Sequence, residues 1–174
     1  MEDSVSFGSR EYLIFLAALA FGRAMDFIST WTATPNLVLE ANPIARWLGW
    51  KWGIPVNIAL VLWLAGQPVP AIVVSTTSLL VAAHNFQHAW VMRSAGELNY
   101  RLWMRERMAE TSPVLFAACL LGQTLLTALV GAAVIWAGGD NAMTFGIGAG
   151  IVGYAAAVLL FTVISLWRGR RSAR

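Results

Sequence analysis

Charged side chains are scarce in this chain of 174 residues, where Asp, Glu, Lys and Arg together make up 12%. An ordinary soluble domain carries roughly 25% charged and about 45–50% apolar residues, whereas 58% of this chain is hydrophobic. So few charges cannot solvate a globular surface of this size. The composition excludes a soluble enzyme, a disordered tail and a nucleic-acid-binding domain. It predicts a single transmembrane domain over residues 1–174, with the lipid bilayer as its partner.

Lysine and cysteine are nearly absent as well. Lys51 is the one lysine, and the formal charge of +3 comes from arginines, which in a membrane protein more often record topology than nucleic-acid binding. Cys119 has no second cysteine to pair with and lies in an apolar run, which predicts a buried small hydrophobe. The Gly-x-Ser-x-Gly elbow, the Walker loop and the Asp-rich motif of CDP-alcohol enzymes are also missing from the sequence.

What the chain does have is a series of apolar segments. A bilayer core of about 30 Å requires roughly 20 apolar residues in a helix. Four segments meet this length: 12–31, 69–91, 113–138 and 142–167. A fifth, 50–66, is shorter and contains Pro55 and Asn57. We include it because Arg46 and Lys51 would otherwise lie on the opposite side from the basic loop after residue 91. The sequence thus predicts an all-α membrane bundle of about five transmembrane helices.

The basic residues indicate how this bundle is oriented. With the N-terminus outside and five crossings, ten of the twelve basic residues fall on the inner side. They are Arg46, Lys51, Arg93, Arg101, Arg105, Arg107, Arg168, Arg170, Arg171 and Arg174. This asymmetry follows the positive-inside rule. We therefore expect an N-out, C-in, multi-pass membrane protein.

Two stretches between the spans predict interfacial structure. The segment 32–49 is a long loop with little charge, in which Asn42 precedes a proline and is typical of a helix N-cap. The segment 94–112 is polar but regular, with Glu97 and Arg101 four residues apart as a helix-supporting pair. It predicts a short interfacial helix whose arginines lie near anionic headgroups. A solvated connector is the alternative.

Ionisable side chains inside spans are costly, and each marks a possible functional site. Asp26 lies near the inner end of the first span, with Thr30 one helical turn further on. His84 and His88 stand four apart in the third span, a spacing that can chelate one metal ion, although the general-base Glu of the zinc-protease motif is absent. The structural alternatives are an ion pair of Asp26 with Arg23, and histidines bonded to backbone or lipid headgroups.

The predicted topology gathers polar residues at one depth. It places five of them at the inner side of the membrane: Asp26, Glu40, Asn42, His84 and His88. The topology rests on Arg and Trp positions, so this agreement is independent of the five residues themselves. Two imidazoles and two carboxylates suit Zn²⁺ or a similar divalent ion. The same group of residues would also suit a substrate headgroup or the passage of a proton.

One part of the chain resembles a known family. The stretch Asp26-x-x-Ser29-Thr30 followed by Glu40-Ala41-Asn42-Pro43-Ile44 resembles an uncharacterised family of small bacterial and archaeal membrane proteins. That family has an Asp and a Thr in an early span and a Glu-x-Asn-Pro sequence shortly after. The resemblance covers about residues 20–60. It implies a multi-span domain of unknown function in the plasma (inner) membrane of a bacterium or archaeon, with signature positions at Asp26, Thr30, Glu40, Asn42 and Pro43.

Two functions from different classes follow. The first is a membrane-embedded enzyme acting on lipid or peptide, in which a divalent metal such as zinc lowers the pKa of a bound water. Its residues would be the ligands His84 and His88, the third ligand or general base Asp26 or Glu40, and the positioning groups Thr30 and Asn42.

The second function is a non-catalytic transporter subunit or accessory subunit of a membrane complex. Small residues at helical spacing let helices approach closely, and the last span carries Gly146, Gly150 and Gly153. This pattern predicts packing within the bundle, a homo-oligomer or a membrane partner held through that span.

Overall fold

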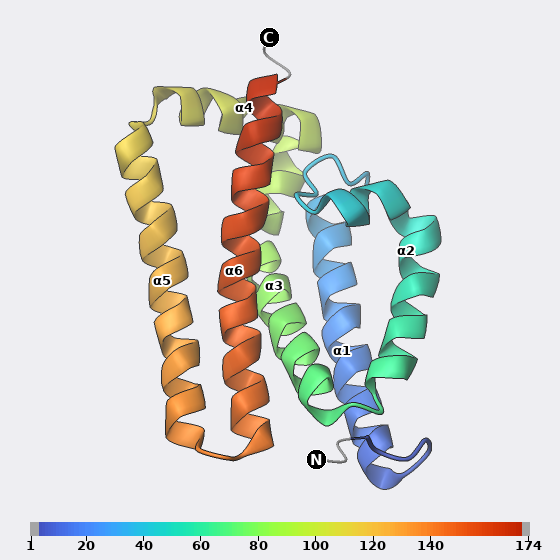
Figure 1. Ribbon diagram of the computed structural model, residues 1–174. Coiled ribbons are helices and arrows are strands. Elements are labelled where there is room, and N and C mark those ends of the chain that lie inside the picture. Colours follow the sequence, from blue (N-terminus) through green and yellow to red (C-terminus); the bar gives the residue numbers. More distant parts are fainter. Residues whose placement is uncertain (1–3, 172–174) are drawn as a thin grey trace.

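The computed structural model describes residues 4–171, with side chains up to residue 167, and this part of the chain contains only helices and their connections. The predicted all-α class is therefore confirmed. The six helices (Figure 1) are α1 Arg10–Ala33, α2 Pro43–Leu64, α3 Pro68–Ala95, α4 Glu97–Glu110, α5 Pro113–Gly138 and α6 Ala142–Arg171.

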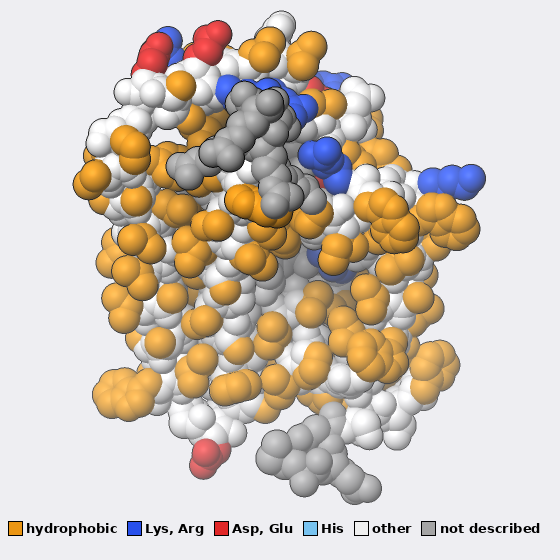
Figure 2. Space-filling model, turned by 45° about the horizontal axis from the view of Figure 1, so that its top comes forward, with side chains coloured by type: hydrophobic (Ala, Val, Ile, Leu, Met, Phe, Trp, Pro, Cys, Tyr) orange, Lys and Arg blue, Asp and Glu red, His pale blue; other side chains and the backbone are white. Residues whose placement is uncertain are grey.

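Four of these helices, α1, α3, α5 and α6, are long and apolar enough to cross a membrane. They correspond to the four long segments predicted from the sequence. In Figure 1, α1, α3 and α6 run in one direction and α5 runs in the other. The space-filling view shows hydrophobic side chains over most of the visible surface of the helical bundle and basic side chains gathered near the α4 end (Figure 2). This is the surface expected of a multi-pass membrane protein.

The second helix does not belong to that set of four. It bends at Gly49, which has φ 59° and ψ −169°, a conformation that favours glycine. The arm from residue 50 to 64 measures about 22 Å at 1.5 Å per residue, less than the about 30 Å of a bilayer core. The arm runs antiparallel to α1 and returns the chain to the start of α3 (Figure 1). Its path fits the predicted fifth crossing, which remains a prediction.

Local signals in the sequence explain where the helices begin. The Asn42 side chain accepts hydrogen bonds from the N–H groups of Ile44 at 2.9 Å and Ala45 at 3.4 Å, so the predicted N-cap is confirmed. Proline occupies the first turn of α2, α3 and α5, where its missing N–H has no intrahelical partner to lose. These caps fix the ends of the loop that precedes α2, which carries Glu40.

The predicted helix at 94–112 is present as α4, which lies across one end of the bundle (Figure 1). The expected pairing of Glu97 with Arg101 is not among the salt bridges of residues 4–171. Glu97 instead accepts hydrogen bonds from the N–H of Asn36 at 2.9 Å and from its amide at 3.5 Å. The side chain that was expected to stabilise α4 thus ties α4 to the loop after α1.

The helices pack in the spatial order α5, α6, α3, α1, α2 (Figure 1), with the closest packing between α1 and α3, α5 and α6, and α3 and α6. Gly146 and Gly150 approach Ile72 and Thr76 of α3. The glycine face of α6 therefore packs inside the bundle, and association with a second chain through that helix remains a prediction. Cys119 is exposed on α5 rather than buried, because that helix has a partner on one side only.

Candidate functional site

A charged cluster joins three helices inside the bundle. The guanidinium of Arg23 on α1 donates from Nη1 to Asp26 Oδ2 at 2.6 Å and to Ser78 Oγ on α3 at 3.0 Å. Its Nε donates to Asn57 Oδ1 on α2 at 2.9 Å. The side chains of Arg23 and Asp26 are 25% and 17% exposed. The Asp26–Arg23 ion pair, which was the structural alternative for Asp26, is therefore present. Arg23 also connects α1 to α2 and α3 through its hydrogen bonds.

A second group of hydrogen bonds continues from this cluster toward the α4 end. Ser29, which is fully buried, donates to the Asp26 carbonyl oxygen at 2.9 Å. Asn85 on α3 donates from Nδ2 to Ser29 Oγ and to Thr30 Oγ1, both at 3.3 Å. Thr30, predicted as a substrate-positioning group, therefore binds Asn85. These bonds keep α1 and α3 in register beside Asp26.

The loop from 34 to 42 is held in place on both sides. The indole N–H of Trp50 on α2 donates to the Pro35 carbonyl oxygen at 2.8 Å. Thr34 Oγ1 accepts from the N–H of Leu39 at 3.0 Å. Leu37 has φ 56°, the left-handed region that non-glycine residues occupy only at a cost. These bonds hold the loop that carries Glu40.

Glu40 differs in its surroundings from Asp26. Its Oε1 accepts the N–H of Asn42 at 2.7 Å. Burial raises the pKa of its carboxyl above the ordinary value, and the negative charge of Asp26 adds to this increase. The Asn42 hydrogen bond and the positive charge of Arg46 act in the opposite direction and offset only part of it. Asp26 and Glu40, two of the predicted site residues, are therefore neighbours, and Asn42 binds Glu40 with its backbone and caps α2 with its side chain.

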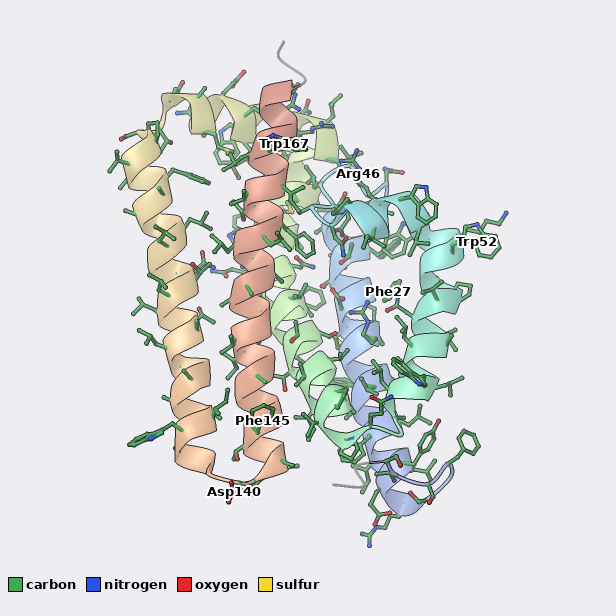
Figure 3. The ribbon with its side chains drawn as sticks, in the orientation of Figure 1. Phe27, Arg46, Trp52, Asp140, Phe145 and Trp167 are labelled. Atoms are coloured by element: carbon green, nitrogen blue, oxygen red, sulfur yellow. The ribbon has the colours of Figure 1, made fainter. Side chains whose placement is uncertain are left out.

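An apolar hollow adjoins the charged cluster. It has a volume of about 370 Å³ and is lined by Phe27, Ile28, Trp31, Pro35, Trp50 and Ile54. Phe27 lies between α1 and α2 (Figure 3), and its ring centroid is 5.5 Å from the guanidinium carbon of Arg23. Phe27 therefore contacts both the hollow and the Arg23 cluster.

His84 and His88 lie on a different face of α3. Their ring centroids are 5.1 Å apart, and the His84 ring is 6.4 Å from that of Tyr154 on α6. His88 Nδ1 is 3.2 Å from the His84 carbonyl oxygen, as in the backbone-bonded alternative. Among residues 4–171, no three His, Cys, Asp or Glu side chains gather closely enough to hold a metal ion. The metal site remains a prediction without structural support.

The sequence interpretation missed several residues of the cluster. In the sequence Asn57 interrupts a short apolar segment, and nothing there marks Ser78 as a partner of Arg23. Both bind Arg23 in the structure. The available signal was Arg23 itself, since a guanidinium inside a span requires hydrogen-bond acceptors from neighbouring helices.

Comparison of the chain with protein-family models, with curated proteins and with solved structures finds no match. The resemblance to a family of unknown function therefore remains an expectation from the sequence.

Proposed function

We propose that this protein is a multi-pass protein of a prokaryotic plasma membrane that binds an amphiphilic molecule between α1 and α2. Its apolar part lies in the hollow beside Phe27, and its polar part lies near the loop that carries Glu40. The observation that carries this proposal is the contact between the two environments: Phe27 lines the apolar hollow and also lies against Arg23 of the charged cluster.

The loose attachment of α2 supports lateral entry from the bilayer. The helix makes few contacts with α1 and α3. Its arm is tied to α1 by the Arg23–Asn57 hydrogen bond and by a bond of 2.9 Å from the Tyr12 hydroxyl to the Leu62 carbonyl oxygen. Since few apolar contacts oppose it, a small outward movement of the arm would widen the hollow without breaking the α1–α3 core.

The two carboxyls take different roles in this proposal. Asp26 is the fixed counter-ion of Arg23, because its Oδ2 accepts from the guanidinium at 2.6 Å. Glu40 is the candidate proton-exchanging group, because burial raises the pKa of its carboxyl and its Oε1 accepts only a backbone N–H, that of Asn42. If the bound amphiphile is a substrate, Glu40 is the residue we expect to act as general acid or base.

The orientation belongs to the same proposal. We infer that the α4 end, where basic side chains gather (Figure 2), faces the cytoplasm, as the positive-inside rule requires. The α2 arm then completes five crossings. Contacts of His84 and His88 with each other and with α6 leave them outside this site. No contact among residues 4–171 specifically favours the accessory-subunit alternative.

The proposal is tested by filling the hollow. Ile54→Trp places an indole where Ile54 lines the cavity, so we expect a detergent-purified variant to carry about tenfold less co-purified amphiphile than the wild type, or roughly 1.4 kcal/mol. Native mass spectrometry measures the bound molecule directly. The matched control is Ile58→Trp, one turn along the same helix, where the side chain is 55% exposed and does not line the hollow.

The control variant should retain the amphiphile at the wild-type level. A wild-type protein that carries no amphiphile, or equal occupancy in both tryptophan variants, would contradict the proposed function. Gel filtration and circular dichroism of each variant separate loss of binding from loss of fold.

A further inference from the structure

The proposed site continues into a second hollow, at the α4 end. Resting on the proposed function, we propose that the polar part of the bound amphiphile is an anionic, phosphate-type lipid headgroup held by Arg46 and Arg101. These arginines come from α2 and α4, 55 positions apart in the chain, and they line one hollow of about 580 Å³. Among the described residues that line it, they are the only charged ones, and both are positive.

The guanidinium groups are available to a ligand. Neither forms a salt bridge with a carboxylate within 4.0 Å in the described part of the chain. Arg46 is exposed and Arg101 half-buried. Glu40 acts on Arg46 electrostatically, but its carboxylate oxygen accepts from the Asn42 backbone instead. Two planar guanidiniums without carboxylate partners are the groups that proteins use to bind phosphate.

The structure also explains how Arg101 reaches this position. Glu97, one turn earlier on α4, accepts both hydrogen bonds of Asn36, and Asn36 lines the same hollow. This contact fixes α4 against the loop and turns the face that carries Arg101 toward it. The acidic side chain nearest in sequence is thus used for positioning rather than for neutralising Arg101.

The two hollows adjoin each other. Pro35 and Trp50 line both of them, and the Trp50 N–H binds the Pro35 carbonyl oxygen at their boundary. The bend at Gly49 places Arg46 on the α4 side and the apolar arm of α2 on the other (Figure 3). One amphiphile therefore meets arginines at its head and Phe27 and Ile54 at its tail, as a phospholipid requires.

The test compares lipids that differ only in the headgroup. Detergent-purified wild-type protein is titrated with dioleoylphosphatidylglycerol and with dioleoylglycerol, which has the same tails and no phosphate, and native mass spectrometry gives the affinities. We expect the phospholipid to bind about tenfold more tightly, and Arg46→Gln and Arg101→Gln each to remove about that factor. Arg105→Gln, on α4 but outside the hollow, is the control and should leave the affinity unchanged.

Different results separate this inference from the function on which it rests. Equal affinity for both lipids and no effect of the two arginine variants, with weaker binding of both lipids to Ile54→Trp, would overturn the headgroup assignment and leave the amphiphile site standing. No effect of Ile54→Trp on either lipid would overturn both. A parallel experiment adds millimolar inorganic phosphate to the protein with bound phospholipid. If phosphate displaces the phospholipid, and if Ile54→Trp does not change the affinity, the ligand is a soluble anion and the lipid assignment is overturned.

Discussion

At the scale of single residues, the protein holds two neighbouring carboxyls in unlike states. Asp26 is bound to a guanidinium from its own helix, whereas Glu40, which is also partly buried, accepts one backbone N–H. From the sequence they were equal candidates for a general base. Their difference depends on which groups face them across helix boundaries, and a single sequence does not contain that information.

The first prediction concerns the pH dependence of stability. Because burial raises the pKa of Glu40 in the folded protein, the folded state binds its proton more tightly than the unfolded state. The free energy of unfolding therefore falls as the pH rises from the ordinary value of 4.5 through the raised pKa. Glu40→Gln removes this loss, so we expect its Tm to exceed that of the wild type at about pH 8 and to match it near about pH 4.

Thermal unfolding in detergent, followed by circular dichroism across this pH range, measures the difference. Glu110→Gln is a suitable control, because Glu110 pairs with Arg107 at the surface with 63% of its side chain exposed and exposed pairs contribute little. A lower Tm of Glu40→Gln at the alkaline end would show that attraction to Arg46 outweighs the cost of burial.

At the scale of elements, glycines decide how closely α5 and α6 approach. A Cβ at Gly131 would lie 2.7 Å from the Gly148 carbonyl oxygen and 2.8 Å from Val152 Cγ2, so the two backbones are in contact there. A Cβ added at Gly122, nine positions earlier on α5, would have no neighbouring atom within 4 Å. The two glycines share a helix and differ only in what lies opposite.

This contrast gives the second stability prediction. Gly131→Ala forces the helices apart, and we expect it to destabilise the protein by about 1–3 kcal/mol, as overpacking does. Gly122→Ala gains helix propensity without a clash, and we expect no loss of stability. Unfolding by SDS in mixed micelles compares the two variants, and equal effects would contradict the close contact between α5 and α6.

The same elements show what could be predicted from the sequence. Long apolar runs, the Asn42 cap and the small-residue pattern of α6 are local signals, and each predicted the local structure correctly. The rotation of a helix in the bundle is not local. Asn85 faces α1 while His84, about 100° around the helix, faces α6. Depth in the membrane does not determine this rotation, so the predicted meeting of the histidines with Asp26 stays a prediction.

At the scale of the whole molecule, the number of crossings decides which loops share a side. With five crossings, residues 4 and 140 lie outside and residue 105 lies inside. Without a crossing by α2, residue 105 would share the side of residue 4 and residue 140 would lie opposite. The α2 arm is therefore the element whose placement the topology depends on.

Cysteine labelling in whole cells distinguishes these arrangements. In a Cys119→Ser background, we expect Ser4→Cys and Asp140→Cys to react with a membrane-impermeant maleimide, and Arg105→Cys to react only after the cells are permeabilised. Labelling of Arg105→Cys and Ser4→Cys from the same side would contradict five crossings. Asp140 suits this test because it lies in the turn between α5 and α6, at the end of the bundle opposite α4 (Figure 3).

The hydrogen bonds of Arg23 also have a consequence for biogenesis. Alone in the translocon, α1 would present a guanidinium to lipid, and α2 would present an amide on a segment too short to partition well. When Arg23 on α1 is hydrogen-bonded to Asn57 on α2 and to Ser78 on α3, the three helices shield these polar groups from lipid. We therefore expect the first three helices to leave the translocon as one unit, after synthesis of α3, whereas the apolar α5–α6 hairpin enters the bilayer independently.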